Sequence, residues 1–220
     1  MSKTQNRTKQ IVTLGMLTAI AYAIMYFGRI PVVLFLKYDP KDVVINIAGF
    51  LFGPLSAFAV SVVVSVVEMF TASTTGYWGC IMNIISTCSF VCTAAVIYKK
   101  RRDVKGAIIG LITGLILMTG VMLLWNYLIT PIYMGYPRSA VAELLIPAFL
   151  PFNLLKGGIN ATITMLLYKP VVIALRRAGL VPEPENKVTT NKKANIGVIL
   201  VSVFILITCI VFVLVLRGDI

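Results

Sequence analysis

Residues 151–160 read Pro-Phe-Asn-Leu-Leu-Lys-Gly-Gly-Ile-Asn and open an apolar segment that is long enough to cross a bilayer. A lysine costs roughly 3 kcal/mol at the centre of a membrane helix, so Lys156 is expected to face protein or a watery cavity. Asn153 lies three residues earlier, which places an amide and an ammonium on one helix face. Such a pair is typical of the polar end of a small-molecule pocket. Alternatively, Lys156 snorkels to the bilayer interface beside an ordinary asparagine at a helix start, and this segment leaves both interpretations open.

The composition predicts an integral membrane protein. Of the 220 residues, 59% are apolar and 13% are charged, and the mean hydropathy is +0.93. The net charge of +12 would favour nucleic acid as a partner of a soluble domain. Here, however, the basic residues cluster at the ends of apolar runs, as in Lys99-Lys100-Arg101-Arg102 and Arg176-Arg177. That is the pattern of cytoplasmic loops, so we predict no nucleic-acid partner.

Several kinds of chemistry are not indicated by the sequence. The chain has no histidine, and its four cysteines show neither metal-ligand spacing nor a paired framework. It therefore lacks the commonest metal ligand and the usual general base. No phosphate-binding glycine loop followed by Lys and Ser or Thr occurs. We predict no enzyme, no metal site and no cofactor, and any energy from ATP must come from partner proteins.

Apolar runs separated by turn signals predict an all-α membrane protein. The expected segments are 10–30, 42–52, 55–70, 80–98, 106–129, 148–175 and 195–216. Segment 42–52 would rise only about 16 Å as a helix, which is too short to span alone. With six segments before the last, every basic cluster falls on the cytoplasmic side.

This pattern divides the chain into three parts. Residues 1–178 are expected to form a six-helix membrane domain, residues 179–194 a polar cytoplasmic linker, and residues 195–220 an additional transmembrane helix that ends outside. The last helix is apolar nearly all round, which predicts no part in a pocket.

Polar and aromatic residues gather at the outer end of the predicted bundle. An outer loop (31–41), a polar turn (71–79) and an external stretch (130–147) lie there, beside the start of the sixth segment. Asn126, near the outer end of the fifth segment, should face inward because lipid cannot satisfy its amide. Aromatic faces can stack on a flat ring while amides and a lysine bind hydroxyls. Glu68 has two candidate partners, Arg29 and Lys156, and such a pair is either structural or part of the ligand site.

A stripe of small residues lies on the first segment. Gly15, Ala19 and Ala23 recur every four residues, which allows another helix to approach closely. Its partner is either another protein or a helix of the same bundle, and the spacing fits both.

Over about residues 8–178 the chain resembles the riboflavin-specific substrate-binding (S) component of energy-coupling factor (ECF) transporters. The similar motifs are Ala19-Ile20-Ala21-Tyr22-Ala23, Phe35-Leu36-Lys37-Tyr38-Asp39-Pro40-Lys41-Asp42, Gly53-Pro54, Ser73-Thr74-Thr75-Gly76 with Met82-Asn83, and Pro151-Phe152-Asn153-Leu154-Leu155-Lys156. The resemblance implies a multi-pass six-helix bundle in a bacterial cell membrane. Such a subunit would capture riboflavin at the outer face and deliver it inward with a transmembrane coupling protein and two cytoplasmic ATPases.

Matched position by position, the resemblance also implies site residues. The residues that bind the ribityl chain would be Asn126, Asn153 and Lys156. Those that line the ring pocket would be Leu36, Lys37, Tyr38 and Gly79. The coupling protein would dock on Gly15, Ala19 and Ala23. Two alternatives stay open: an S component for another vitamin or base, and a membrane scaffold that transports nothing. The resemblance does not account for residues 179–220.

Overall fold

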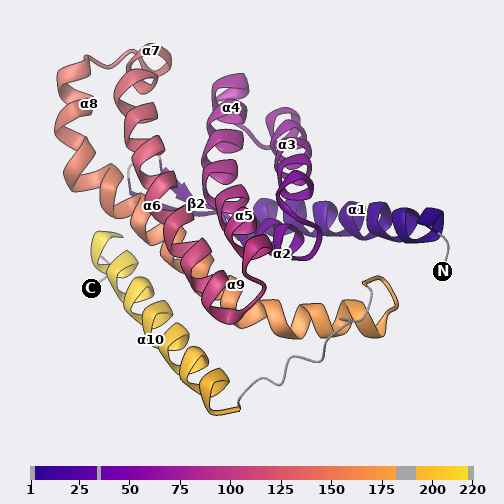
Figure 1. The fold of residues 1–220 in the computed structure, drawn as a ribbon. Helices are drawn as coiled ribbons and strands as arrows, with labels where there is room; N and C mark the ends of the chain where they lie inside the picture. The colour runs from indigo at the N-terminus through magenta and orange to yellow at the C-terminus, as the bar shows by residue number, and fades with distance from the viewer. Residues whose placement is uncertain (1–2, 34–35, 182–191, 218–220) are drawn as a thin grey trace.

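The computed structural model describes residues 3–33, 36–181 and 192–217, and this part of the chain is mainly helical (Figure 1). In chain order the elements are α1 (Lys3–Gly28), β1 (Ile30–Val33), β2 (Leu36–Tyr38), α2 (Lys41–Phe52), α3 (Pro54–Thr71), α4 (Gly76–Thr87), a π-helical turn (Cys88–Cys92), α5 (Thr93–Lys100), α6 (Val104–Leu128), α7 (Thr130–Met134), α8 (Arg138–Leu144), a second π-helical turn (Leu145–Phe149), α9 (Leu150–Arg177) and α10 (Lys192–Arg217).

Five stretches of the described residues are long and apolar enough to cross a membrane. They are Arg7–Gly28, Pro54–Thr71, Gly76–Lys100, Val104–Leu128 and Arg138–Arg177, and a shorter apolar stretch runs over Ile199–Val211. These spans confirm the prediction of a helical membrane protein.

The predicted segment 42–52 is α2, which has 12 residues and is not one of the five spans. Its first ten residues are buried, and it packs against α1, α3, α5 and α9. Because protein rather than lipid surrounds this helix, it can carry charged and amide side chains such as Lys41, Asp42 and Asn46.

The outer loop predicted at 31–41 is instead a short antiparallel hairpin. β1 pairs with β2 through Ile30 and Tyr38, Pro31 and Lys37, and Val33 and Leu36, with an irregularity between Pro31 and Val33. Two prolines in the stretch favoured a loop, but Pro31 lies in a strand of only four residues, where a missing donor is tolerated. The fold is therefore helical with one small sheet.

The external stretch predicted at 130–147 is also largely helical. It contains α7 and α8, and α8 continues through a π-helical turn into α9. Pro137 immediately precedes α8, and Pro147 falls in the π-helical turn. A proline removes a backbone donor, and an irregular turn accommodates that loss without ending the helix.

Close packing of α6 depends on two glycines. A Cβ atom on Gly110 would lie 2.7 Å from the carbonyl oxygen of Ala94, and one on Gly114 would lie 2.4 Å from that of Phe90. Both distances are far below van der Waals contact, so only glycine lets α6 approach this neighbouring helix so closely. The Asp103 side chain caps the start of α6 by accepting a hydrogen bond from the Gly106 amide at 2.6 Å.

The last helix, α10, lies along α9 and also contacts β1 (Figure 1). Leu206 and Cys209 of α10 pack against a buried apolar cluster that includes Val32, Phe152 and Ile159. Most of the predicted linker, residues 182–191, lies outside the described residues. Gly179, two residues after the end of α9 at Arg177, turns the chain in a left-handed conformation with φ of 69°.

Candidate ligand-binding site

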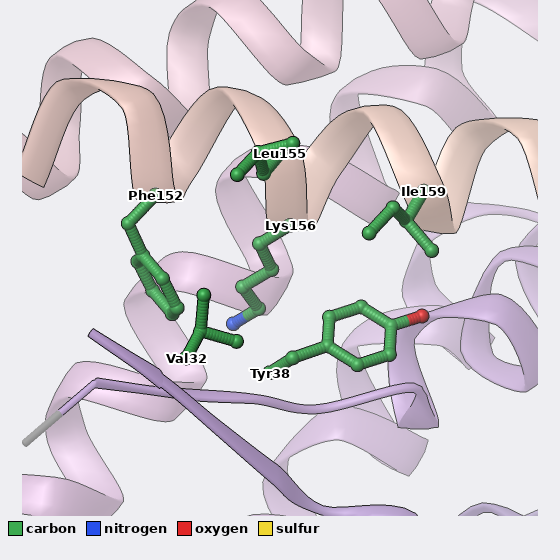
Figure 2. Close-up of a pocket in the computed structure, with 6 residues that line it drawn as sticks. All are labelled: Val32, Tyr38, Phe152, Leu155, Lys156 and Ile159. Atoms are coloured by element: carbon green, nitrogen blue, oxygen red, sulfur yellow. The ribbon is translucent and has the colours of Figure 1, made fainter. Parts of the chain in front are cut away.

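A narrow cavity lies between the hairpin and α9 (Figure 2). It measures about 10 Å³, roughly the space that one water molecule needs. Its wall is apolar except for a phenol and an ammonium, and it consists of Val32, Tyr38, Phe152, Leu155, Lys156 and Ile159. A ligand with a flat ring system would need the hairpin to move away from α9.

Lys156 extends from α9 toward the hairpin (Figure 2). The residue is only 8% exposed, and its Nζ lies 3.7 Å from Oδ2 of Asp42 and 3.4 Å from Oγ of Ser86. The ammonium is therefore held inside the protein. The alternative in which Lys156 snorkels to the bilayer interface does not describe this structure.

The two asparagines singled out from the sequence are both buried. Asn153 donates from Nδ2 to the carbonyl oxygen of Phe149 at 2.8 Å. Asn126 donates to the carbonyl oxygen of Met122 at 2.8 Å and accepts from the hydroxyl of Thr130 at 2.9 Å. Both amides thus face protein, as predicted, but neither lines the narrow cavity.

The three residues of β2 that were assigned to the ring pocket lie on two different faces of the strand. Leu36 and Tyr38 are buried in the apolar cluster beside α9, whereas Lys37 between them is exposed. Side chains alternate along a strand, so Lys37 points away from the face that carries Tyr38. The structure thus places Tyr38 in the cavity wall with Lys156 and Leu36 in the adjoining apolar cluster, whereas the side chain of Lys37 points away.

Gly79 lies in the first turn of α4 and is buried. A Cβ atom there would come within 2.0 Å of the Thr75 hydroxyl oxygen, so a larger residue would force the Thr75 side chain to move. Gly79 does not line the narrow cavity.

Beside this site, three buried charged side chains and the partly buried Arg29 form a cluster, here called the Lys41 cluster: Arg29, Asp39, Lys41 and Glu68. Nζ of Lys41 lies 2.8 Å from Asp39 Oδ2 and 2.7 Å from Glu68 Oε2. Arg29 pairs with the same two carboxylates. Two cations and two carboxylates balance, and such pairing offsets the desolvation cost of burial. Of the two partners considered for Glu68, the structure contains Arg29.

A second buried group, here called the Asp42 cluster, surrounds Lys156: Asp42, Ser86, Thr87, Lys156 and Asn160. Asp42 accepts a hydrogen bond from the Thr87 hydroxyl at 2.7 Å. Asn160 donates to Asp42 Oδ2 at 3.4 Å and accepts from the Tyr38 hydroxyl at 2.8 Å. This chain of contacts joins the hairpin, α2, α4 and α9 around the ammonium.

The sequence analysis missed the roles of Lys41, Asp42 and Asn160. One signal could have found the first two: Asp39, Lys41 and Asp42 fall within four positions directly before an apolar helix. Charges at the start of a segment too short to span a membrane are expected to be buried in protein and paired.

Pairing also changes the acidity of Asp39, which lies between β2 and α2. Burial, the largest single influence, would raise the pKa of its carboxyl group, but the cations of Lys41, Lys156 and Arg29 together outweigh burial and lower the pKa to about 2. An unpaired aspartate has a pKa of about 3.9. The ion pair therefore stabilises the fold above about pH 4, and this contribution is lost as the pH falls toward 2.

The small-residue stripe of α1 faces away from the bundle. Gly15, Ala19 and Ala23 are exposed, whereas Leu17 and Ala21 are buried. No atom of the described chain would lie within 4 Å of a Cβ atom added at Gly15. Packing inside the bundle, the alternative for this stripe, does not occur among the described residues.

Comparison with known proteins identifies relatives over most of the chain. Residues 9–168 match the family described as ECF transporter, substrate-specific component. The riboflavin transporter RibU of Staphylococcus aureus (strain TCH60) is 31% identical over 180 residues, which cover 78% of this chain and 94% of the relative. The riboflavin transporter FmnP of Bacillus subtilis (strain 168) is 30% identical over 175 residues, or 74% of this chain and 91% of the relative. A solved structure of the S component of a bacterial ECF transporter is 30% identical and superposes with a TM-score of 0.65, covering 77% of this chain and 99% of that one.

Proposed function

The chain belongs to the substrate-specific components of ECF transporters, and we propose that the ligand it binds and delivers is riboflavin. As a member of this family it is a multi-pass subunit of a transporter in a bacterial membrane and not an enzyme. The coverage of its relatives is high, and two of them are named as riboflavin transporters at 30–31% identity. Their names support riboflavin as the ligand.

One observation on this chain carries the proposal: a buried, incompletely hydrogen-bonded ammonium faces an apolar and aromatic wall. Lys156 has only long contacts, at 3.4 and 3.7 Å, so it can still donate to ligand hydroxyls. Tyr38 and Phe152 beside it offer aromatic faces to a flat ring. We assign the ribityl contacts to Asn126, Asn153 and Lys156, and the ring contacts to Leu36 and Tyr38. We assign no ring contact to Lys37, whose side chain points away from this face, or to Gly79, which does not line the cavity.

We further propose that six segments cross or enter the membrane before α10. Five are the spans described above, and α2 is the sixth, buried among the others. The basic residues after α5 and at the end of α9 then face the cytoplasm. Residues 179–191 would link this domain to α10, which begins at Lys192 and forms a seventh, appended crossing.

Transport requires partners, because no nucleotide-binding motif occurs in the sequence. We propose a transmembrane coupling protein docked on Gly15, Ala19 and Ala23 of α1, together with two cytoplasmic ATPases. The exposed stripe supports this docking face, because small residues permit close approach of a second helix.

Uptake by whole cells tests the transport function. Cells without riboflavin uptake of their own should accumulate labelled riboflavin when they express this chain with the coupling protein and both ATPases. Replacing the phosphate-binding lysine of each ATPase should abolish accumulation. Uptake that persists with those inactive ATPases would contradict the proposed energy source. Uptake of a different vitamin under the same conditions would contradict the proposed ligand.

We predict that removing α10, by ending the chain after Val181, lowers riboflavin affinity by less than about tenfold. None of its described side chains lines the cavity, but the helix packs behind Val32 and α9 and so supports the wall. Ending at Val181 keeps the turn at Gly179, whose carbonyl oxygen accepts a hydrogen bond from Lys9. Titration of the two purified proteins measures the effect. A loss of more than about tenfold would mean that α10 is part of the binding bundle.

A further inference from the structure

We propose that Asp42 is a positioning residue: its carboxylate fixes the ammonium of Lys156 where the ligand needs it. The inference rests on the proposed function, because it assigns a role to Lys156 in ligand binding. It adds a residue at the start of α2, the last residue of the motif that also contains Leu36, Lys37 and Tyr38, to which the resemblance assigns no role.

The carboxylate of Asp42 has little freedom to move. The residue is fully buried in the first turn of α2. One oxygen, Oδ1, accepts the Thr87 hydroxyl at 2.7 Å, and the other, Oδ2, lies 3.4 Å from Asn160 Nδ2. Donors from α4 and α9 therefore hold both oxygens, and Oδ2 is left facing Lys156 at 3.7 Å.

The two buried lysines of the region differ in a way that separates their roles. Lys41 is 0% exposed and contacts its two carboxylates at 2.7 and 2.8 Å, which are short charge-assisted contacts. Lys156 contacts its carboxylate at 3.7 Å and a hydroxyl at 3.4 Å. Lys41 is held as a structural charge, whereas Lys156 is oriented by Asp42 without being saturated by it.

The charge of Asp42 also offsets the desolvation cost of burying the Lys156 ammonium. An ammonium that is left without a counter-charge in an apolar site carries a large desolvation cost and tends to move toward water. Asp42 keeps Lys156 in the site before the ligand arrives. Since Asn160 contacts both Asp42 and the Tyr38 hydroxyl, the same group also ties the hairpin to this ammonium.

A double-mutant cycle tests the proposal, with riboflavin affinity measured by quenching of flavin fluorescence. Asp42→Asn keeps the size of the side chain and removes its charge. We expect it to weaken binding by about tenfold in the wild-type background and by less than about twofold in Lys156→Ala. The background dependence is the decisive readout, because a purely structural role would weaken both backgrounds equally.

Glu68→Gln is the matched control. It removes a buried carboxylate from the Lys41 cluster, which has no ion pair with Lys156. Its effect on affinity should be the same with and without Lys156→Ala. If the effect of Glu68→Gln depended on Lys156 as strongly as that of Asp42→Asn, any nearby buried carboxylate would have this effect. That result would overturn the specific role of Asp42.

Thr87→Val keeps the inference testable if Asp42→Asn does not fold. It retains both charges and removes only the 2.7 Å hydrogen bond that orients Asp42. We expect a smaller loss, about threefold, again confined to the background that contains Lys156. Equal losses in both backgrounds would overturn the inference while wild-type binding of riboflavin stands. No riboflavin binding by the wild-type protein would overturn the proposed function, and this inference with it.

Discussion

Replacing Lys156 with alanine is expected to weaken riboflavin binding by about 5- to 150-fold. The substitution removes a charge-assisted hydrogen bond in a desolvated pocket, and the loss of such a bond costs roughly 1–3 kcal/mol. Isothermal titration of the purified protein measures the change. Lys169→Ala is the matched control, because Lys169 lies on the same helix and is exposed. That variant should bind like the wild type.

Asn153→Ala tests the other half of the polar pair and is expected to reduce affinity over the same range. The buried amide already donates to the Phe149 carbonyl oxygen, which leaves its second N–H and its oxygen to meet a ligand. Wild-type affinity in both Lys156→Ala and Asn153→Ala would contradict the assignment of the site. Lys156 would then be a structural counter-charge for Asp42.

Replacing Ala19 with tryptophan is expected to abolish riboflavin uptake while leaving riboflavin binding unchanged. Ala19 is exposed at the centre of the stripe, and a large side chain there would hold the coupling protein away from α1. Capture of the coupling protein by the tagged variant, together with titration of riboflavin, tests both halves. Ala23→Trp should behave in the same way.

Ile20→Trp is the control for this second prediction. Ile20 is 45% exposed on the same helix but lies about 100° around the axis from Ala19. It should retain both uptake and capture. If Ala19→Trp instead loses ligand binding together with docking, the stripe supports the bundle itself and the proposed docking face is wrong.

Much of the helical framework could be predicted from the sequence because long apolar runs and turn residues mark it directly. Gly53 and Pro54 separate α2 from α3 where the turn was predicted, and Gly53 has a φ of 93° there. The hairpin was missed because strands of three and four residues leave too little alternation to detect. The helical continuation before α9 was missed because Pro137 and Pro147 indicate a break unless a π-helical turn absorbs one of them.

The site was predictable to a similar degree. The rule that lipid cannot satisfy an amide predicted an inward-facing Asn126. For Asn153 and Lys156 the sequence left a pocket and the bilayer interface both open, and the structure shows that all three residues are buried. Their partners could not be predicted in the same way. Lys156 meets Asp42, 114 positions earlier in the sequence, because two helices pack together, and no sequence spacing encodes that contact. For the same reason, only the structure shows that Lys41, and not Lys156, pairs with Glu68 together with Arg29.

The most direct test of the account is equilibrium titration of the purified wild-type protein with riboflavin. Flavin fluorescence should be quenched in a saturable manner with one riboflavin bound per chain, and other water-soluble vitamins at the same concentration should not compete. Those results would support a riboflavin-specific component. Absence of riboflavin binding by folded protein, or displacement of riboflavin by an unrelated vitamin, would contradict the proposed specificity.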